Sequence, residues 1–197
     1  MIDINKANLI KLDAEYIPYI REFDCLNDDE NFIGFKAKKI RKFKAHSENL
    51  NKFLKEKALS EQEEGLSTTY ILLYEEQIIG FISTCSDSIT LGKEEKAEEN
   101  FPYQVLPAIK IAKLAIDKRF QNMGLGEFLI RSIIGFSITI RDFTGVKFIT
   151  VDCYEHRVPY YNKQGFIVNI IQKENRESDN PLSLRLNIDK FLETLEV

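Results

Sequence analysis

Cysteine and histidine are both scarce in this chain of 197 residues, which has three cysteines and two histidines. The cysteines, Cys25, Cys85 and Cys153, lie far apart, form no CxxC pair and have no neighbouring pair of histidines. An odd and scattered set of this kind argues against a disulfide framework or a zinc site, and it is typical of a reducing compartment. We therefore expect no structural disulfide and no metal.

Long apolar runs and an excess of basic charge are missing as well. No apolar stretch approaches the roughly 20 residues that span a bilayer. Residues 1–6 lack the basic region and apolar stretch of a secretory signal. With 27 Lys and Arg against 31 Asp and Glu, the net charge of −4 gives no overall basic footprint for nucleic acid. These absences predict a cytoplasmic protein without membrane association.

What is present is the composition of an ordinary globular protein, with 44% hydrophobic and 29% charged residues. A chain of this length can bury a substantial core as one domain, and no internal repeat divides it. We predict a single domain over residues 1–197, with an irregular or helical N-terminal part at 1–46.

The order of apolar patterns along the chain predicts an α/β fold. Runs rich in β-branched and aromatic residues predict strands at 68–74, 78–85, 108–116, 146–153, 166–171 and 182–188. Helical spacing predicts helices at 48–64, 124–141 and 159–164, the first with Ser47 as its N-cap. Residues 75–77 supply a tight polar turn, so the first two strands should form an antiparallel hairpin. The charged segment 92–100 is interpreted as a loop.

The segment that indicates chemistry is the turn between the strand at 108–116 and the helix at 124–141. It reads Gln121-Asn122-Met123-Gly124-Leu125-Gly126. The first turn of a helix has free N–H groups and a partial positive charge, which suit a phosphate group. Glycine lets a ligand approach the backbone closely. Taken alone, the GxG pattern is equally typical of a turn without a ligand, because it matches neither a dinucleotide fingerprint nor a Walker loop.

Two motifs together carry a family resemblance. Residues 121–126 resemble the Q/R-x-x-G-x-G/A motif of the GNAT superfamily of acyl-CoA N-acetyltransferases, and residues 160–166 resemble its F/Y-Y-x-x-x-G-F signature. A helix and a strand separate the motifs, as in that superfamily. The resemblance covers roughly residues 68–188. It implies a GNAT-like mixed, mostly antiparallel central sheet flanked by helices, with a splayed parallel strand pair holding the cofactor and an acetyl-CoA-binding core at 108–166.

The resemblance also implies a reaction and its residues. Acetyl-CoA would be the cosubstrate, and a primary amine would attack it directly. Tyr161 would act as the general acid that protonates the leaving thiolate, although it could instead be a packing aromatic, a role that Tyr160 suits better. Pro159 departs from the family pattern and predicts a helix that starts late. The implied cofactor-binding residues are Leu114, Ile116, Gln121, Asn122, Met123, Gly124, Leu125, Gly126 and Glu127, with Leu114 and Ile116 pairing with the pantetheine arm through their backbone.

A base must remove a proton from the acceptor ammonium, and the residues leave its identity open. Four side chains are candidates, and each could equally be an ordinary surface group. They are Asp117, Asp152, Glu155 and His156.

The upstream half resembles toxin-type acetyltransferases, which act on the amino group of aminoacyl-tRNA and are encoded beside an antitoxin. The similar segments are 23–25 (FDC), 50–59 (LNKFLKEKAL) and 67–72 (STTYIL), although here about two dozen residues separate the first two. Those residues include the basic segment 36–44, which is either a tRNA-contacting patch or, as we favour, the solvated face of an amphipathic helix. Other amine acceptors, a non-catalytic CoA-binding regulatory module and a homodimer all stay open.

Overall fold

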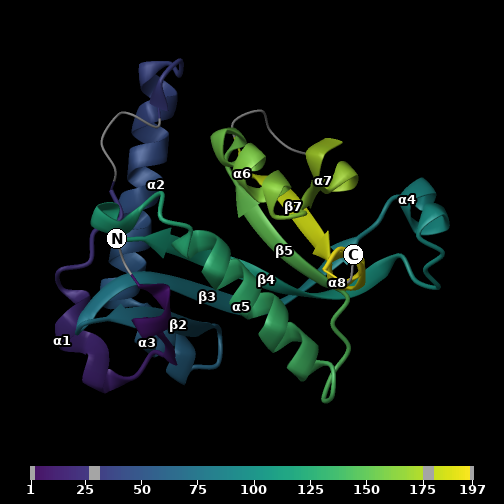
Figure 1. Cartoon of the computed structure of the whole chain (residues 1–197). Coiled ribbons are helices and arrows are strands. Elements are labelled where there is room, and N and C mark those ends of the chain that lie inside the picture. Colours follow the sequence, from purple (N-terminus) through teal and green to yellow (C-terminus); the bar gives the residue numbers. More distant parts are fainter. Residues whose placement is uncertain (1–2, 27–31, 175–179, 196–197) are drawn as a thin grey trace. The chain divides into compact units, whose positions relative to one another are not determined.

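The computed structural model describes residues 3–26, 32–174 and 180–195. Figure 1 shows the helices and strands along the chain. The strands are β1 (Asn8–Lys11), β2 (Thr68–Tyr74), β3 (Gln77–Thr90), β4 (Val105–Ile116), β5 (Phe148–Cys153), β6 (Ile167–Val168) and β7 (Leu182–Asn187). The α-helices are α1 (Ile17–Ile20), α2 (Ala37–Glu56), α3 (Ala58–Glu63), α4 (Lys93–Glu98), α5 (Leu125–Ile140), α6 (Val158–Lys163), α7 (Ile170–Glu174) and α8 (Ile188–Glu193). Short 3-10 helices are η1 (Ile4–Lys6), η2 (Ala14–Tyr16), η4 (Lys118–Phe120) and η5 (Glu155–Arg157).

The strands form one sheet in the order β1-β2-β3-β4-β5-β7-β6. Strands β4 and β5 pair in parallel, from Ala108 opposite Phe148 to Ile111 opposite Val151. The pairs β1–β2, β2–β3, β5–β7 and β6–β7 are antiparallel. The predicted mixed, mostly antiparallel sheet with one parallel strand pair is therefore confirmed.

The chain divides into two compact units. The first comprises Met1–Thr84 with Ala112–Ile130, and the second comprises Cys85–Ile111 with Arg131–Val197. Strands β3 and β4 and helix α5 each contribute residues to both units. The expectation of a single domain stays a prediction, and the units are described separately below.

The hairpin of β2 and β3 follows from its turn residues. Glu75 and Glu76 have φ values of 47° and 62°, and the strands pair from Tyr74 opposite Gln77. Positive φ at both central residues is the geometry of a type I′ turn, whose twist matches that of two antiparallel strands. The predicted hairpin is confirmed, and β3 runs beyond the predicted end at Cys85 to Thr90.

The core of the first unit lies between helix α2 and strands β2 and β3. Phe81 of β3 contacts the ring of Phe23 at a centroid distance of 5.5 Å and that of Phe53 at 6.1 Å. Leu54 is 1% exposed and Ala58 is fully buried, so the apolar stripe of α2 and the start of α3 face this core. Burial of each large apolar side chain contributes about 1.5–3 kcal/mol, which holds α2 against the sheet.

Helix α2 begins at Ala37, and the prediction of a helix starting at Glu48 was wrong. Ser47 does not cap a helix, because its hydroxyl donates to the carbonyl of Phe43 within α2. Phe43 is 4% exposed and its ring contacts that of Phe35 at 5.3 Å. This aromatic contact continues the buried stripe by two turns toward the N-terminus, so the segment 36–44 lies almost wholly within the helix.

The second unit contains a helix where a loop was predicted. Residues 92–100 include α4, because Glu95 accepts the N–H of Gly92 in a capping arrangement. Glu95 is 8% exposed and its Oε1 lies 2.6 Å from Nη2 of Arg185, which is 4% exposed. The charge of Glu95 is thus buried against β7, a tertiary contact that the local sequence pattern does not indicate.

The strand predicted at 166–171 is limited to Ile167–Val168, and α7 begins at Ile170. Asn169 is 2% exposed and its side chain contacts Ser183 and Arg185, which ends the strand by turning the chain.

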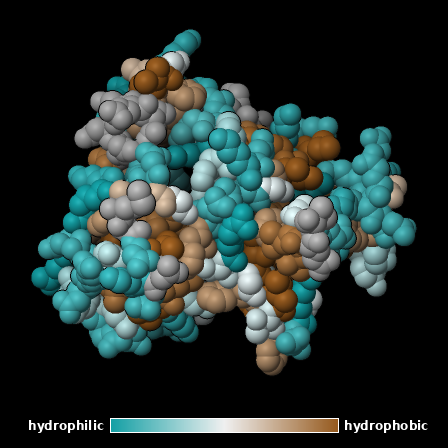
Figure 2. All heavy atoms as spheres, viewed as in Figure 1, coloured by the Kyte–Doolittle hydropathy of each residue, from teal (hydrophilic) through white to brown (hydrophobic). Residues whose placement is uncertain are grey.

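The face of the molecule drawn in Figure 2 is covered mainly by hydrophilic residues, with separate hydrophobic patches between them. Among the described residues, no helix is both long and apolar enough to cross a membrane.

Candidate active site

The glycine turn leads from β4 through η4 into the N-terminus of α5. Asn122 and Gly124 have φ values of 63° and 80°, so the chain reverses through two left-handed residues before α5 begins at Leu125. A Cβ built on Gly124 has no atom within 4 Å, which leaves open space beside the backbone there. Because the first turn of a helix leaves N–H groups without partners inside the helix, this turn has the properties that suit a phosphate.

Strand β4 enters the turn with its side chains alternating between two environments. Leu114 and Ile116 are half-buried, while Ala115 between them belongs to the core of the first unit. Ile116 lies so close to Gly80 of β3 that a Cβ on Gly80 would stand 2.7 Å from its Cδ1. Glycine at position 80 therefore allows β3 to pass close beside the C-terminal end of β4.

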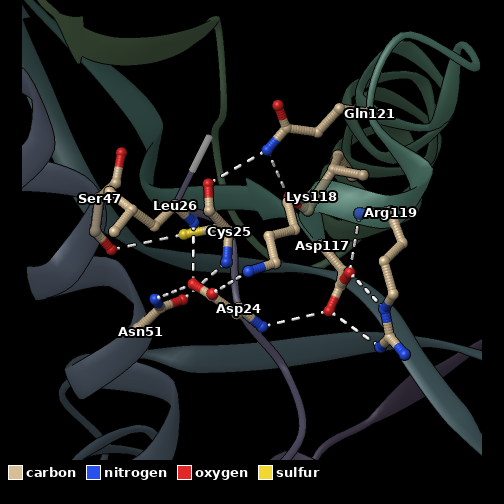
Figure 3. A network of polar contacts seen from close by, with 10 residues as sticks. Asp24, Cys25, Leu26, Ser47, Asn51, Asp117, Lys118, Arg119 and Gln121 are labelled. Atoms are coloured by element: carbon tan, nitrogen blue, oxygen red, sulfur yellow. Dashed lines mark hydrogen bonds and ion pairs between the residues drawn. The ribbon is translucent and has the colours of Figure 1, made fainter. Parts of the chain in front are cut away.

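Gln121, the first residue of the glycine motif, directs its side-chain amide toward the backbone. Its Nε2 donates to the carbonyl oxygens of Cys25 and Ile116, each at 3.1 Å. Figure 3 shows this amide joining the turn to the segment at Cys25. The sequence motif implies a cofactor role for Gln121, and the geometry adds a connection to residues 24–26.

Segment 24–26 is held in turn by Asn51 of α2, a contact that sequence reasoning missed. The side-chain amide of Asn51 donates from Nδ2 to Oδ1 of Asp24 at 2.7 Å and accepts the N–H of Cys25 at 2.9 Å. The available signal was the joint occurrence of the FDC and LNKFL segments in the toxin-type resemblance. In the structure, the side-chain amide of Asn51 on a helix forms hydrogen bonds with an irregular loop.

Asp24 also pairs with Lys118 of η4, whose Nζ lies 2.8 Å from its Oδ2. Burial alone would raise the pKa of Asp24, but hydrogen bonds from Lys118, the N–H of Leu26 and Asn51 outweigh burial and lower it. Asp24 is therefore ionised at neutral pH.

Asp117, one of the candidate bases, is bound on both carboxylate oxygens. Its side chain is 1% exposed, its Oδ2 accepts the N–H of Asp24 at 3.1 Å, and Arg119 donates to it from Nε at 2.9 Å and from Nη2 at 3.1 Å. The N–H of Arg119 donates to Oδ1 as well, at 3.0 Å. Asp117 would have to break these contacts before taking a proton from an amine, so the geometry gives it a structural role.

Tyr161 lies on α6 in the second unit and is 7% exposed. Its ring contacts those of Tyr160 and Phe166 at 5.1 and 5.5 Å. Tyr160, which we expected to be the better packing residue, is half-buried, whereas Tyr161 is buried. Burial, with smaller contributions from Cys153 and Tyr160, raises the pKa of Tyr161 well above its usual range, so the hydroxyl keeps its proton at neutral pH.

Pro159 stands in the first turn of α6, where its missing N–H breaks no helical hydrogen bond. The helix begins at Val158, one residue before the predicted start. Gly165 has a φ of 90° and ends this segment, after which Phe166 is buried to 1% exposure. The glycine and phenylalanine of the second motif thus shape the end of α6 and anchor it.

The three other candidate bases lie in the second unit, unlike Asp117. Asp152 pairs with Nζ of Lys110, and His156 stacks on Tyr154 with centroids 6.4 Å apart. Glu155 is exposed at the start of η5. These contacts do not distinguish one base. Over the described ranges, no group of three or more His, Cys, Asp or Glu side chains is arranged to hold a metal ion.

Comparison with known proteins agrees with the fold. Residues 35–180 match the family described as the acetyltransferase (GNAT) domain. A tRNA-acetylating toxin of Mycobacterium tuberculosis is 28% identical over 116 residues, which are 58% of this chain and 69% of that protein.

Solved structures share the fold over nearly the whole chain. AtaT complexed with acetyl-methionyl-tRNAfMet has a TM-score of 0.73 at 20% identity, covering 97% of this chain and 99% of that one. A tyrosine-to-phenylalanine mutant of KacT has a TM-score of 0.73 at 19% identity, covering 96% and 99%. At this identity the similarity shows the fold alone.

An α/β fold with a parallel strand pair and a glycine turn opening a helix is the arrangement expected of an acyltransferase of the GNAT type. With most of its length matched by the family, this chain belongs to the GNAT acetyltransferases. It is an acetyl-CoA-dependent acetyltransferase, with acetyl-CoA as its cosubstrate.

Proposed function

We propose that the chain transfers the acetyl group of acetyl-CoA to the α-amino group of an aminoacyl-tRNA. The observation that carries this proposal is the 28% identity over 116 residues to a tRNA-acetylating toxin. The matched share of that protein, 69%, is most of its length. A primary amine outside tRNA, which we favoured on the sequence alone, becomes the alternative acceptor.

The N-terminal half of α2 gives this proposal a physical basis. Six of the nine residues at 36–44 are Lys or Arg and none is acidic, in a chain whose net charge is −4. Of these, Lys36, Lys38 and Arg41 are exposed. A local basic surface of this kind attracts a phosphate backbone and makes binding sensitive to salt.

Helix stability does not account for this arrangement. The first turn of α2 contains no acidic residue, and cations there oppose the helix dipole at a cost of about 0.3–1 kcal/mol each at low salt. The basic residues at spacings of three and four also repel one another. The exposed cations Lys36, Lys38 and Arg41 at the start of α2 therefore fit a polyanionic ligand.

We assign the pyrophosphate of acetyl-CoA to the turn at 122–127 and proton donation to Tyr161. The lone pair of the deprotonated amine attacks the thioester carbonyl carbon, so a C–N bond forms and the C–S bond breaks. The sulfur leaves as a thiolate and takes the hydroxyl proton of Tyr161. The proton that the nitrogen loses as the amide forms restores the hydroxyl. The raised pKa of Tyr161 keeps its hydroxyl protonated at neutral pH, so a proton is present for this step.

The test uses the purified protein with radiolabelled acetyl-CoA and a panel of acceptors. The panel contains aminoacyl-tRNAs, the same tRNAs uncharged, amino acid esters, a peptide with a free N-terminus and a polyamine. We expect label on charged tRNA only, decreasing as salt rises. Label on peptides or small amines with none on any charged tRNA would overturn the proposed acceptor. Binding of acetyl-CoA without transfer to any acceptor would instead indicate a non-catalytic module.

Charge reversal on α2 provides a matched comparison. The triple variant Lys36→Glu, Lys38→Glu and Arg41→Glu should lose its affinity for tRNA. Its affinity for acetyl-CoA and its melting temperature should be at least as high as those of the parent. Reversal of three exposed lysines in the C-terminal part of α2 and just after it, Lys52, Lys55 and Lys57, makes the same change in net charge. Equal losses of tRNA affinity in both variants would show that only the total charge matters.

A further inference from the structure

We propose that Asn51 of α2 is a positioning residue for the cofactor turn, acting through Cys25 and Gln121. The inference rests on the assignment of the pyrophosphate of acetyl-CoA to the turn at 122–127. It concerns residues of the first unit only, and Figure 3 shows their contacts from close by.

The first connection joins α2 to segment 24–26. Cys25 is held at two points one helical turn apart, because its N–H donates to Asn51 Oδ1 at 2.9 Å and its thiol donates to the carbonyl of Ser47 at 3.4 Å. Residues 23–26 belong to no helix or strand, so their backbone groups have no regular ladder. A segment of this kind takes its conformation from the side chains that satisfy it.

The second connection joins segment 24–26 to the residues that open the turn. The carbonyl of Asp24 accepts the N–H of Lys118 at 2.8 Å, and the N–H of Asp24 donates to Asp117 at 3.1 Å. The carbonyl of Cys25 then accepts Nε2 of Gln121 at 3.1 Å. The N–H and carbonyl of Asp24 thus hold residues 117–118, and the carbonyl of Cys25 holds Gln121.

Gln121 is the residue that these contacts place, and it stands immediately before the left-handed Asn122. A non-glycine residue at a φ of 63° is held there at a cost of about 1–3 kcal/mol and persists only where its surroundings enforce it. Gln121 anchors the start of the turn to the carbonyls of Cys25 and Ile116. Loss of Asn51 would remove one of the two contacts between Cys25 and α2, and would thereby loosen one of the two carbonyls to which Gln121 donates.

A purely structural role for Asn51 makes a different prediction, and Gln62 supplies the matched control. Gln62 also bridges two backbone segments of the first unit, donating to the carbonyl of Leu12 at 2.7 Å and accepting the N–H of Thr69 at 3.1 Å. None of its contacts involves residues 117–127. Asn51→Ala and Gln62→Ala therefore remove the same kind of bridge, but only Asn51→Ala reaches the turn.

The experiment compares acetyl-CoA with acetyl-pantetheine, which has the thioester and the arm but no pyrophosphate. Apparent KM values for both acetyl donors, and Kd for CoA by calorimetry, are measured for the parent, Asn51→Ala, Gln121→Ala, their double variant and Gln62→Ala. We expect Asn51→Ala to weaken acetyl-CoA about tenfold and to leave the KM for acetyl-pantetheine unchanged. The double variant should lose less than the product of the two single losses, because both residues act through Cys25.

Gln62→Ala should lower the melting temperature without changing either KM. If Asn51→Ala folds poorly, Asn51→Leu serves in its place, since it keeps the size of the side chain and removes the acceptor for the N–H of Cys25. Equal weakening of both acetyl donors, or losses that multiply in the double variant, would overturn the inference. A parent protein that does not distinguish acetyl-CoA from acetyl-pantetheine would show instead that the phosphate assignment is wrong.

Discussion

The ring of Tyr161 packs edge-on against that of Phe166, with centroids 5.5 Å apart. Both side chains are buried, at 7% and 1% exposure. The aromatic ring of Tyr161 therefore holds α6 in place, whereas only its hydroxyl can donate a proton. Packing and catalysis depend on different atoms of one side chain, so a single substitution can separate them.

Tyr161→Phe should lower kcat by about 10² while leaving the melting temperature and the affinity for acetyl-CoA nearly unchanged. The ring and its contacts remain, and positioned acid catalysis contributes about 10²–10⁴ in rate, with the lower figure expected for a thiolate leaving group. Tyr160→Phe is the control, because Tyr160 is the adjacent tyrosine on α6. Steady-state kinetics and thermal melts check both, and an unchanged kcat in Tyr161→Phe would contradict the assigned role.

Gly124→Val should weaken acetyl-CoA binding by at least tenfold and destabilise the fold by about 1–3 kcal/mol. A β-branched residue is strained at a φ of 80°, and its side chain would occupy the open space beside the turn. Gly135 in the exposed middle of α5 has no positive φ and also has no atom near its missing Cβ. Gly135→Ala should therefore stabilise the protein by about 1 kcal/mol and leave binding unchanged, as calorimetry and thermal melts can show.

Glu95→Gln should destabilise the second unit by about 3–5 kcal/mol, because it leaves the buried guanidinium of Arg185 without its carboxylate. Faster hydrogen exchange in α4 and a lower urea midpoint are the expected readouts. Glu56→Gln breaks an exposed pair with Lys52, whose side chains are 58% and 61% exposed, and should change stability by less than about 0.5 kcal/mol. Equal effects of the two substitutions would show that burial of the Arg185 pair is irrelevant.

Asp189 makes part of the stability dependent on pH. Its hydrogen bonds from Lys147 and Arg141 lower its pKa below the ordinary 3.8, against a smaller opposing effect of burial. The contribution of Asp189 to the free energy of unfolding is present above about pH 4, and it is lost as the pH falls through the lowered pKa of the folded state. Asp189→Asn should reduce the free energy of unfolding at neutral pH, and the difference from the parent should shrink in acid. A difference that stays constant from about pH 7 to about pH 2 would contradict this.

Local sequence signals predicted the elements that depend on neighbouring residues. Strand β2 has the predicted limits. Helix α5 begins at Leu125, between the two glycines of the motif and one residue after its predicted start. Hydrophobic alternation and helical spacing are properties of the chain itself, and tertiary packing here reinforces them. The glycine motif and the Tyr161 motif likewise identified the family without any structure.

Tertiary contacts decided the rest. The start of α2 depends on Phe43 finding a ring to pack against, and α4 depends on Glu95 meeting Arg185 from a distant strand. Arg185 lies 90 residues from Glu95, so the sequence around Glu95 does not indicate this partner. The prediction of a loop at 92–100 failed for this reason, since the capping contact of Glu95 and its buried pair with Arg185 hold this charged segment as a helix.

The sequence by itself determined that the chain is an acetyltransferase with a glycine turn before α5, because short motifs carry that chemistry in adjacent residues. Only the tertiary structure showed that Gln121 reaches Cys25 and that Asn51 holds Cys25 from another element. Hydrogen bonds between segments separated by 96 and 26 residues leave no periodic pattern in the sequence. They become visible only when folding brings the irregular segment 24–26 between α2 and the glycine turn.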